Sequence, residues 1–136
     1  MDKINSILRK LNLRPTKQRT AIINALIAEG DTHVTASSLG KILEKNKFKV
    51  ATATIYNNLN ELSEKGFLKK VLVEKDRMWF DTNLSSHYHF YDEEEDKLTD
   101  VKENQIEFLA FPKIPKGKAL KSLDIIINVK KKSRLE

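Results

Sequence analysis

The stretch ATATIYNNLNELSEKGFLKKVLVEKDRMWFDT, residues 51–82, contains a change of hydrophobic period that decides the fold. Ile55, Leu59 and Leu62 recur at the three- to four-residue spacing of one helix face. Gly66 follows at the place where a glycine commonly ends a helix. The first half of the stretch therefore predicts a helix, and the change to a period of two after Gly66 predicts strands.

The hairpin after this helix is predicted to have strands 69–74 and 77–82, joined by the turn residues Lys75 and Asp76. Thr52 is the expected N-cap of the helix, because a threonine hydroxyl can accept a hydrogen bond from a free N–H group of the first turn. A helix followed directly by such a hairpin is typical of the second half of a winged helix.

Three earlier segments also show the spacing of buried helix faces. Pro15 suits the first turn of the second of these helices, and Thr35 or Ser37 is the expected cap of the third. In a winged helix the third helix would support the fourth, and the fourth would enter the DNA major groove. The three segments are residues 2–12, 13–30 and 33–48.

The rest of the chain predicts a small second domain. Its expected elements are strands at 87–91 and 97–101, a short helical stretch near 103–109, a proline-rich linker and a last strand within 122–129. So small a sheet buries little surface alone, so we expect it to pair with a second copy through residues 84–136. The predicted fold is α+β: a winged helix at 1–82, then a small α/β dimerisation domain at 83–136.

Charge and composition narrow the function. The chain carries a net charge of +6, and all of it falls in residues 1–82, with 15 Lys and Arg against 9 Asp and Glu. A basic first half suggests a module that binds a polyanion such as double-stranded DNA. The chain has no run of about 18 apolar residues that could span a membrane, and its charged N-terminus is unlike a signal peptide. We therefore expect a cytoplasmic protein.

The chain contains no cysteine. Disulfides, thiolate zinc sites and cysteine-ligated haem or iron–sulfur clusters are therefore excluded. A metal ion could be held only by imidazole, carboxylate or water.

The predicted recognition helix presents polar side chains suited to base edges. Asn57 could bond adenine, and Thr52, Thr54 or Tyr56 could pack on a thymine methyl group. Asn58 and Glu61 are expected on the same exposed face. Basic residues on either side could hold the phosphate backbone, and these are Arg14, Lys17, Arg19, Lys75 and Arg77.

The segment SSHYHF, residues 85–90, holds two of the three histidines of the chain. On a strand, His87 and His89 point to one face while Tyr88 points to the other. The two imidazoles could therefore bind one metal ion, or they could be two ordinary surface histidines. Nitrogen and oxygen donors suit Fe²⁺, Mn²⁺ or Zn²⁺ without distinguishing among them.

Several motifs follow one another along the chain: LRPTKQR, HVTASSL, ATATIYNNLNEL followed by GFLKK, and WFDTN followed by HYHF. Together, and in this order, they resemble the ferric uptake regulator (Fur) family. The resemblance implies a dimeric winged-helix transcription factor that senses a metal ion and binds AT-rich palindromic operators. It also implies a regulatory metal site made of His33, Asp81, His87, His89 and Asp100.

The chain departs from the usual family pattern at the structural zinc site. Most members have a Cys-x-x-Cys after the His-x-His strand, and those positions here are Asp92 and Glu95. The structural zinc site is therefore absent. The cysteine-free pattern most resembles the iron response regulator (Irr) subfamily, which implies a haem response with His87 and His89 as haem ligands. That subfamily usually has three consecutive histidines, whereas Tyr88 is the middle residue here.

The resemblance thus implies an iron- or haem-responsive DNA-binding regulator that acts as a homodimer, with haem or a haem-delivering protein as a further expected partner. His33 would come from the DNA-binding half and His87 from the dimerisation half, so a shared metal would set the angle between the halves. A manganese, zinc or peroxide sensor of the same family is the alternative. A small metallohydrolase is a further alternative. The sequence contains no His-Glu-x-x-His motif and no nucleophile motif that would support an enzyme.

Overall fold

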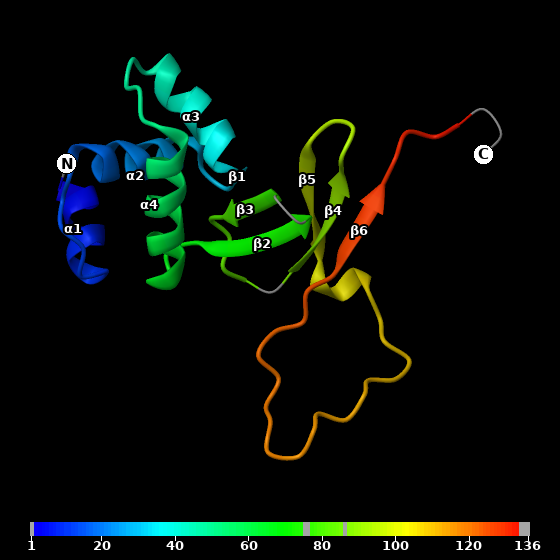
Figure 1. The fold of residues 1–136 in the computed structure, drawn as a ribbon. Helices are drawn as coiled ribbons and strands as arrows, with labels where there is room; N and C mark the ends of the chain where they lie inside the picture. The colour runs from blue at the N-terminus through cyan, green and yellow to red at the C-terminus, as the bar shows by residue number, and fades with distance from the viewer. Residues whose placement is uncertain (1, 75–76, 86, 134–136) are drawn as a thin grey trace. The chain divides into compact units, whose positions relative to one another are not determined.

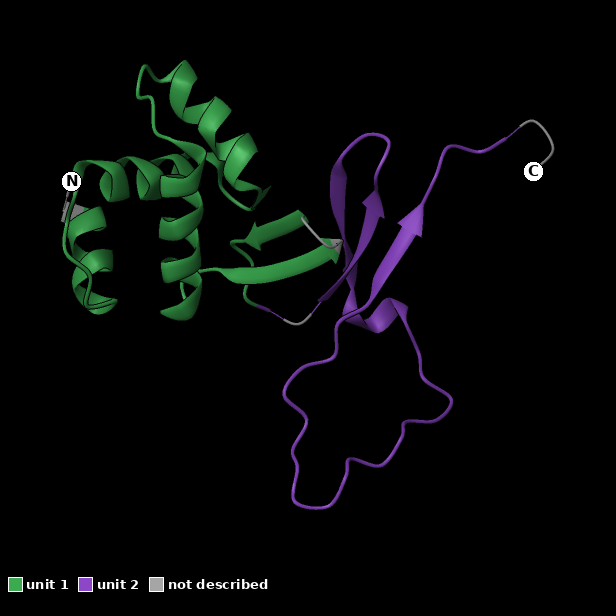
Figure 2. Cartoon of the chain, in the orientation of Figure 1, with its two compact units in different colours: residues 1–84 green, residues 85–136 purple. Residues whose placement is uncertain are grey.

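The computed structural model describes residues 2–74, 77–85 and 87–133 of the 136-residue chain. The chain forms two compact units, Met1–Leu84 (unit 1) and Ser85–Glu136 (unit 2), which Figure 2 shows in different colours. The division lies two residues after the expected boundary at 82.

Unit 1 begins with the four helices that the hydrophobic spacing predicted (Figure 1). The apolar faces of these helices meet in one core, in which Ile22, Leu39, Ile55, Leu59 and Leu62 have no exposed surface. The amphipathic spacing is sufficient to explain this packing, because each helix turns its periodic apolar residues inward. The helices are α1 (Asp2–Lys10), α2 (Lys17–Glu29), α3 (Ala36–Lys45) and α4 (Thr52–Glu64).

The helix starts differ from the predictions at two positions. Helix α2 is capped by the Thr16 side chain, which accepts the Arg19 N–H, so Pro15 precedes the cap instead of lying in the first turn. The prediction that Thr52 caps α4 is wrong. The N-cap is Ala51, whose carbonyl already accepts the Ile55 N–H at 3.0 Å, so Thr52 is the first residue inside the helix. Helix α4 therefore has no side-chain cap.

Helix α3 has the cap that was predicted for it. Thr35 is the N-cap, and its hydroxyl accepts the Ser38 N–H at 3.0 Å. The Ser38 hydroxyl in turn accepts the Thr35 N–H at 2.9 Å, which completes a capping box.

The hairpin of unit 1 consists of β2 (Lys69–Glu74) and β3 (Arg77–Asp81), and β3 ends one residue earlier than predicted. The predicted turn at 75–76 lies outside the described residues. A third strand, β1 (His33–Val34), was not predicted and pairs with β3, so the antiparallel sheet has the order β1-β3-β2. Phe80 joins the sheet to the helical core and packs edge-on against Tyr56, with ring centroids 6.0 Å apart.

Unit 2 contains a second three-stranded sheet with the order β5-β4-β6 (Figure 1). Its strands are β4 (His87–Asp92), β5 (Lys97–Lys102) and β6 (Ile126–Val129); β5 is antiparallel and β6 parallel to β4. The helical stretch expected at 103–109 is only a short 3-10 helix, η1 (Glu103–Gln105). It ends there because Ile106 is extended, with φ −121 and ψ 122. In the described residues, no helix has the length and apolar character needed to cross a bilayer.

The contrast between the caps of α3 and α4 leads to a prediction. Thr35→Ala should lower the free energy of unfolding by about 0.5–2 kcal/mol, because it leaves first-turn N–H groups without a partner. Ala51→Ser should raise it by about 1 kcal/mol, because the new hydroxyl can cap α4. Urea unfolding of both variants and the unchanged protein would measure the two effects. An Ala51→Ser variant no more stable than the parent would show that the first turn of α4 gains nothing from a cap.

Candidate functional site

In unit 1, a histidine and a buried aspartate face each other across two strands. The antiparallel register of β1 and β3 pairs His33 with Asp81 directly, and His33 Nε2 lies 3.3 Å from Asp81 Oδ2. The other carboxylate oxygen, Oδ1, accepts the Asn83 N–H at 2.8 Å. Asp81 is only 1% exposed, so these contacts compensate for part of its lost hydration. They also fix the carboxylate with Oδ2 directed toward the imidazole.

The chain just after Asp81 is tied to the residue before His33. Thr82 donates its N–H to the Thr32 carbonyl at 3.2 Å and accepts the Thr32 N–H on its hydroxyl at 3.0 Å. These bonds extend the short β1–β3 pairing by one residue. His33 and Asp81 are therefore held by backbone as well as by their own side chains.

In unit 2, two imidazoles converge on one carboxylate oxygen. His87 Nε2 lies 3.2 Å and His89 Nε2 lies 3.5 Å from the same atom, Asp100 Oδ1. His89 and Asp100 are paired directly in the antiparallel β4–β5 register, and the two rings are 4.5 Å apart between centroids. Both histidines are buried, at 8% and 3% exposure. They share one face of the sheet, as strand alternation predicts.

The tautomer of the neutral His87 ring follows from its second contact. Nδ1 lies 2.7 Å from the Ser85 carbonyl, and because a carbonyl only accepts, Nδ1 must carry the hydrogen. In the neutral ring, Nε2 then holds a lone pair directed at Asp100 Oδ1, which is also an acceptor. Two facing acceptors at this distance need a proton or a cation between them. An imidazole held by a carbonyl at its other nitrogen is the usual arrangement of a metal-binding histidine.

The donor set therefore fits a small divalent cation. On one face of its sheet, unit 2 offers two imidazole nitrogens and one carboxylate oxygen. Unit 1 offers one imidazole nitrogen and one carboxylate oxygen. Mixed nitrogen and oxygen donors suit Fe²⁺, Mn²⁺ and Zn²⁺. Asn83 and Ser85, which orient Asp81 and His87 through backbone groups, were not foreseen, although each lies only two residues from the side chain that it orients.

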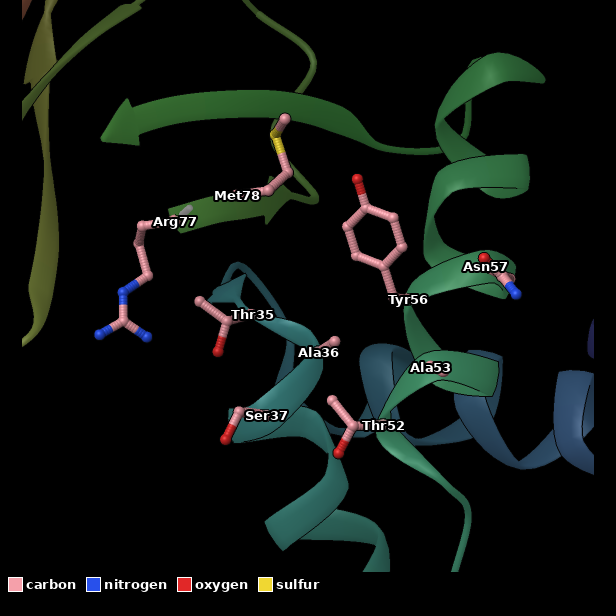
Figure 3. Close-up of a pocket in the computed structure, with 9 residues that line it drawn as sticks. All are labelled: Thr35, Ala36, Ser37, Thr52, Ala53, Tyr56, Asn57, Arg77 and Met78. Atoms are coloured by element: carbon pink, nitrogen blue, oxygen red, sulfur yellow. The ribbon is translucent and has the colours of Figure 1, made fainter. Parts of the chain in front are cut away.

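The candidate nucleic-acid surface lies around a pocket of about 340 Å³ in unit 1 (Figure 3). The first turns of α3 and α4 form one side of it, and Arg77 and Met78 of β3 form the other. Three of the residues predicted to contact bases line this pocket: Thr52, Tyr56 and Asn57. Thr35, Ala36, Ser37, Ala53 and Met78, which also line it, were not singled out in the sequence for this role.

Other residues predicted to face DNA are already engaged within unit 1. Arg19 donates from Nη2 to Glu61 Oε2 at 3.0 Å and from Nη1 to the Arg14 carbonyl, and its side chain is only 15% exposed. Arg19 thus joins α2 to α4. Thr54 is half-buried, and its carbonyl accepts the side-chain amide of Asn58 at 2.9 Å. Arg14 and Lys17 are exposed, as a phosphate contact requires.

Comparisons with known proteins identify the family and the fold of the chain. A sequence model of the ferric uptake regulator family matches residues 10–128. The peroxide-responsive repressor PerR of Staphylococcus aureus is 36% identical over 106 residues, which are 76% of this chain and 71% of that protein. This relative does not confirm the expected iron response regulator subfamily.

Solved structures show the same fold. The ferric uptake regulator of Vibrio cholerae has a TM-score of 0.73 at 20% identity, with 93% of this chain and 98% of that one covered. The regulator of Pseudomonas aeruginosa with manganese has a TM-score of 0.69 at 22% identity, with 95% and 98% covered. The predicted α+β fold class is confirmed. With the family model matching most of its length, the chain belongs to the ferric uptake regulator family, whose members are metal-responsive transcription regulators.

Proposed function

We propose that this protein binds double-stranded DNA as a homodimer and that a divalent metal ion controls its affinity for the operator. The observation that carries the proposal is the convergence of His87 and His89 on one oxygen of Asp100, with the His87 ring held in the tautomer that leaves Nε2 as a ligand. The proposed ligands of the metal are His33, Asp81, His87, His89 and Asp100.

The proposed control depends on the division of these ligands between the units. His33 and Asp81 belong to unit 1, and the other three belong to unit 2. Ligands from both units bound to one ion would hold the units in a single arrangement. In a dimer, that arrangement sets the distance between the two α4 helices, which must match half-sites about 34–36 Å apart. Couplings of this kind are typically about 1–3 kcal/mol.

We assign DNA recognition to the pocket surface of unit 1. Thr52, Tyr56 and Asn57 would contact bases from the first turns of α4, with Thr54 beside them. Arg14 and Lys17 would contact phosphates. Arg19 would act indirectly in this scheme, because its bonds to Glu61 and to the Arg14 carbonyl hold α2 against α4.

The effector has two further candidates. The 36% identical repressor of S. aureus is peroxide-responsive, which favours a peroxide response here. Haem bound at His87 or His89 would use imidazoles that already converge on a carboxylate, an arrangement better suited to a small cation than to an axial haem ligand. Membership in a family of regulators also argues against the metallohydrolase alternative.

The metal site can be tested by removing its imidazoles. In a His87→Ala, His89→Ala double variant, Mn²⁺ should no longer raise operator affinity, a gain of about 5–150-fold for a coupling of this size. Fluorescence anisotropy with labelled operator at fixed salt would measure the affinity, and calorimetry would measure Mn²⁺ binding. Asp92→Asn, on the same strand but outside the proposed ligands, should leave both unchanged. A full metal response in the double variant would exclude this site.

A variant of His33 would separate metal binding from the control of operator affinity by the metal. His33→Ala leaves His87, His89 and Asp100 in place, so the variant should still bind Mn²⁺, with lower affinity. It should lose the effect of Mn²⁺ on operator binding, because no imidazole of unit 1 then holds the ion. Calorimetry would measure Mn²⁺ binding, and fluorescence anisotropy with labelled operator would measure the affinity for DNA. A variant that keeps the full Mn²⁺ effect on DNA would contradict the proposed link between the units.

The salt dependence of operator affinity distinguishes residues that contact phosphates from residues that contact bases. Arg14→Ala and Lys17→Ala should each reduce the slope of log affinity against log salt by about 1, because each removes one phosphate contact. Asn57→Ala should leave the slope unchanged but cost about 1–3 kcal/mol on the specific operator, because it removes a base contact. Lys65→Ala, at the far end of α4, is the matched control. Equal effects of all four variants on the slope would refute the assignment.

The effectors can be compared on one operator. Affinity should be measured with Fe²⁺-loaded and Mn²⁺-loaded protein before and after hydrogen peroxide, and with haem added to metal-free protein. A peroxide sensor should lose affinity only in the Fe²⁺ form, whereas a plain metal sensor should keep it in both. A change produced by haem alone, and abolished in the double histidine variant, would instead support the haem response.

A further inference from the structure

Unit 1 contains a second cavity, separate from the pocket in Figure 3. This cavity, the α2 cavity, measures about 600 Å³ and is lined by residues of α1, of α2 and of the turn that follows α3. Ile4 contributes from α1, and Phe48 contributes from the turn. Cavities that hold small molecules in proteins measure about 300–1,000 Å³. The α2 cavity is therefore large enough for a ligand.

The α2 cavity exists because one face of α2 carries side chains that do not fill it. Lys17, Thr20, Ala21 and Asn24 line the cavity, and their spacing of three to four residues places them on one face of the helix. The face that carries Ile22 is fully buried in the core. The short or polar side chains of the first face leave a gap between α1 and the turn after α3.

The inner part of the α2 cavity is apolar. Ile4 is only 6% exposed and belongs to the core, and Ala21 and Phe48 are half-buried and lie against it. A hydrocarbon chain placed here would remove apolar surface of both the protein and the chain from water. The inner part of the cavity therefore favours an apolar group.

The end of the α2 cavity nearest the start of α2 is positively charged. Lys17 lines this end and is exposed, and the first turn of α2 contains no acidic residue. The Thr16 hydroxyl accepts the Arg19 N–H, so the N–H groups of Lys17 and Gln18 have no partner within the helix. The positive end of the helix dipole adds to the charge of Lys17.

The residues around this cavity also carry positive charge. Phe48 lies between Lys47 and Lys49, and Ile4 follows Lys3; all three lysines are exposed. None of the lining residues that the structure describes is acidic, and none of their immediate neighbours in the sequence is acidic. The charge therefore favours an anion over a cation as the ligand.

We propose that the α2 cavity binds an amphipathic carboxylate of the fatty-acid class. Its hydrocarbon tail would lie against Ile4 and Phe48, and its carboxylate would accept hydrogen bonds from Lys17 and from the first turn of α2. An inorganic anion would leave the apolar part of the cavity unused. A neutral hydrocarbon would leave the charge of Lys17 unused. A ligand with a tail and one carboxylate matches both parts.

Such a ligand would also affect DNA binding, a consequence that rests on the proposed function. Lys17 is one of the two residues proposed to contact DNA phosphates. A carboxylate bound to Lys17 neutralises a charge that a phosphate would otherwise neutralise, so the ligand and the operator compete for Lys17. The ligand should therefore lower the affinity of the protein for the operator.

Calorimetry on the full-length protein tests the chemical class of the ligand. Decanoate, added below the concentration at which it forms micelles, should bind at one site per chain. Decan-1-ol should bind at least about tenfold more weakly because it lacks the charge, and acetate should not bind because it lacks the tail. Decyltrimethylammonium, which has a similar tail and the opposite charge, should not bind. Equal binding of decanoate and decyltrimethylammonium would overturn the proposal.

Two variants that fill the α2 cavity test its position. Ala21→Phe should weaken decanoate binding at least about tenfold, because the new ring takes the place of the tail. Asn24→Phe, at an exposed position of the lining, should do the same without altering the core. Ala28→Phe, on an exposed part of α2 outside the lining, is the matched control and should leave binding unchanged. Circular dichroism would show which variants are folded. Unchanged decanoate binding in either folded cavity variant would overturn the proposal.

Operator binding tests the competition for Lys17. Saturating decanoate should lower operator affinity and reduce the slope of log affinity against log salt by about 1, as expected for the loss of one phosphate contact. Decanoate should have no effect on operator binding by the Ala21→Phe variant. Decanoate bound to the unchanged protein without any loss of operator affinity would refute the competition. A protein that binds decanoate in this cavity but never binds the operator would instead refute the proposed function alone.

Discussion

Both units use the same constraint to place their polar side chains: direct pairing of a histidine and an aspartate across an antiparallel ladder. His33 is opposite Asp81 in unit 1, and His89 is opposite Asp100 in unit 2. Side chains at directly opposite positions have Cβ atoms about 4.5–5.5 Å apart, so imidazole and carboxylate meet without a long or flexible reach. A shift of one residue in either register would turn the histidine to the other face. The proposed metal donors are therefore only as well placed as the strands are aligned.

Each register is secured by elements that the hydrophobic pattern already specifies. In unit 1, Phe80 lies one residue before Asp81 and is fully buried in the helical core. Because neighbouring residues of a strand point to opposite faces, burying Phe80 forces Asp81 to the other face. In unit 2, Tyr91 is 1% exposed on the face that carries His89. The apolar residues that drive folding thus also decide where the proposed metal donors point.

Some of these features can be predicted from the sequence alone, and others cannot. Long periodic segments such as that of Ile55, Leu59 and Leu62 identify their helix, because burying a whole face outweighs local preferences. Strand β1 has only two residues and no periodicity, so its existence depends on pairing with β3 and cannot be seen locally. The shared face of His87 and His89 follows from alternation alone. The Arg19–Glu61 ion pair spans 42 residues and follows only from the packing of α2 on α4.

Because the chain contains no cysteine, unit 2 cannot be held together by a thiolate zinc site. The positions that hold Cys-x-x-Cys in most of the family are Asp92 and Glu95 here, and Asp92 Oδ1 accepts the Glu95 N–H at 3.1 Å. A hydrogen bond therefore closes this turn where the family pattern has a metal. A neutral hydrogen bond contributes about 0.5–1.5 kcal/mol and one to a charged group about 1.5–3, whereas a structural zinc ion contributes far more. A sheet of three strands buries little surface alone, so in the proposed homodimer a second copy would supply further stability, which would then depend on protein concentration.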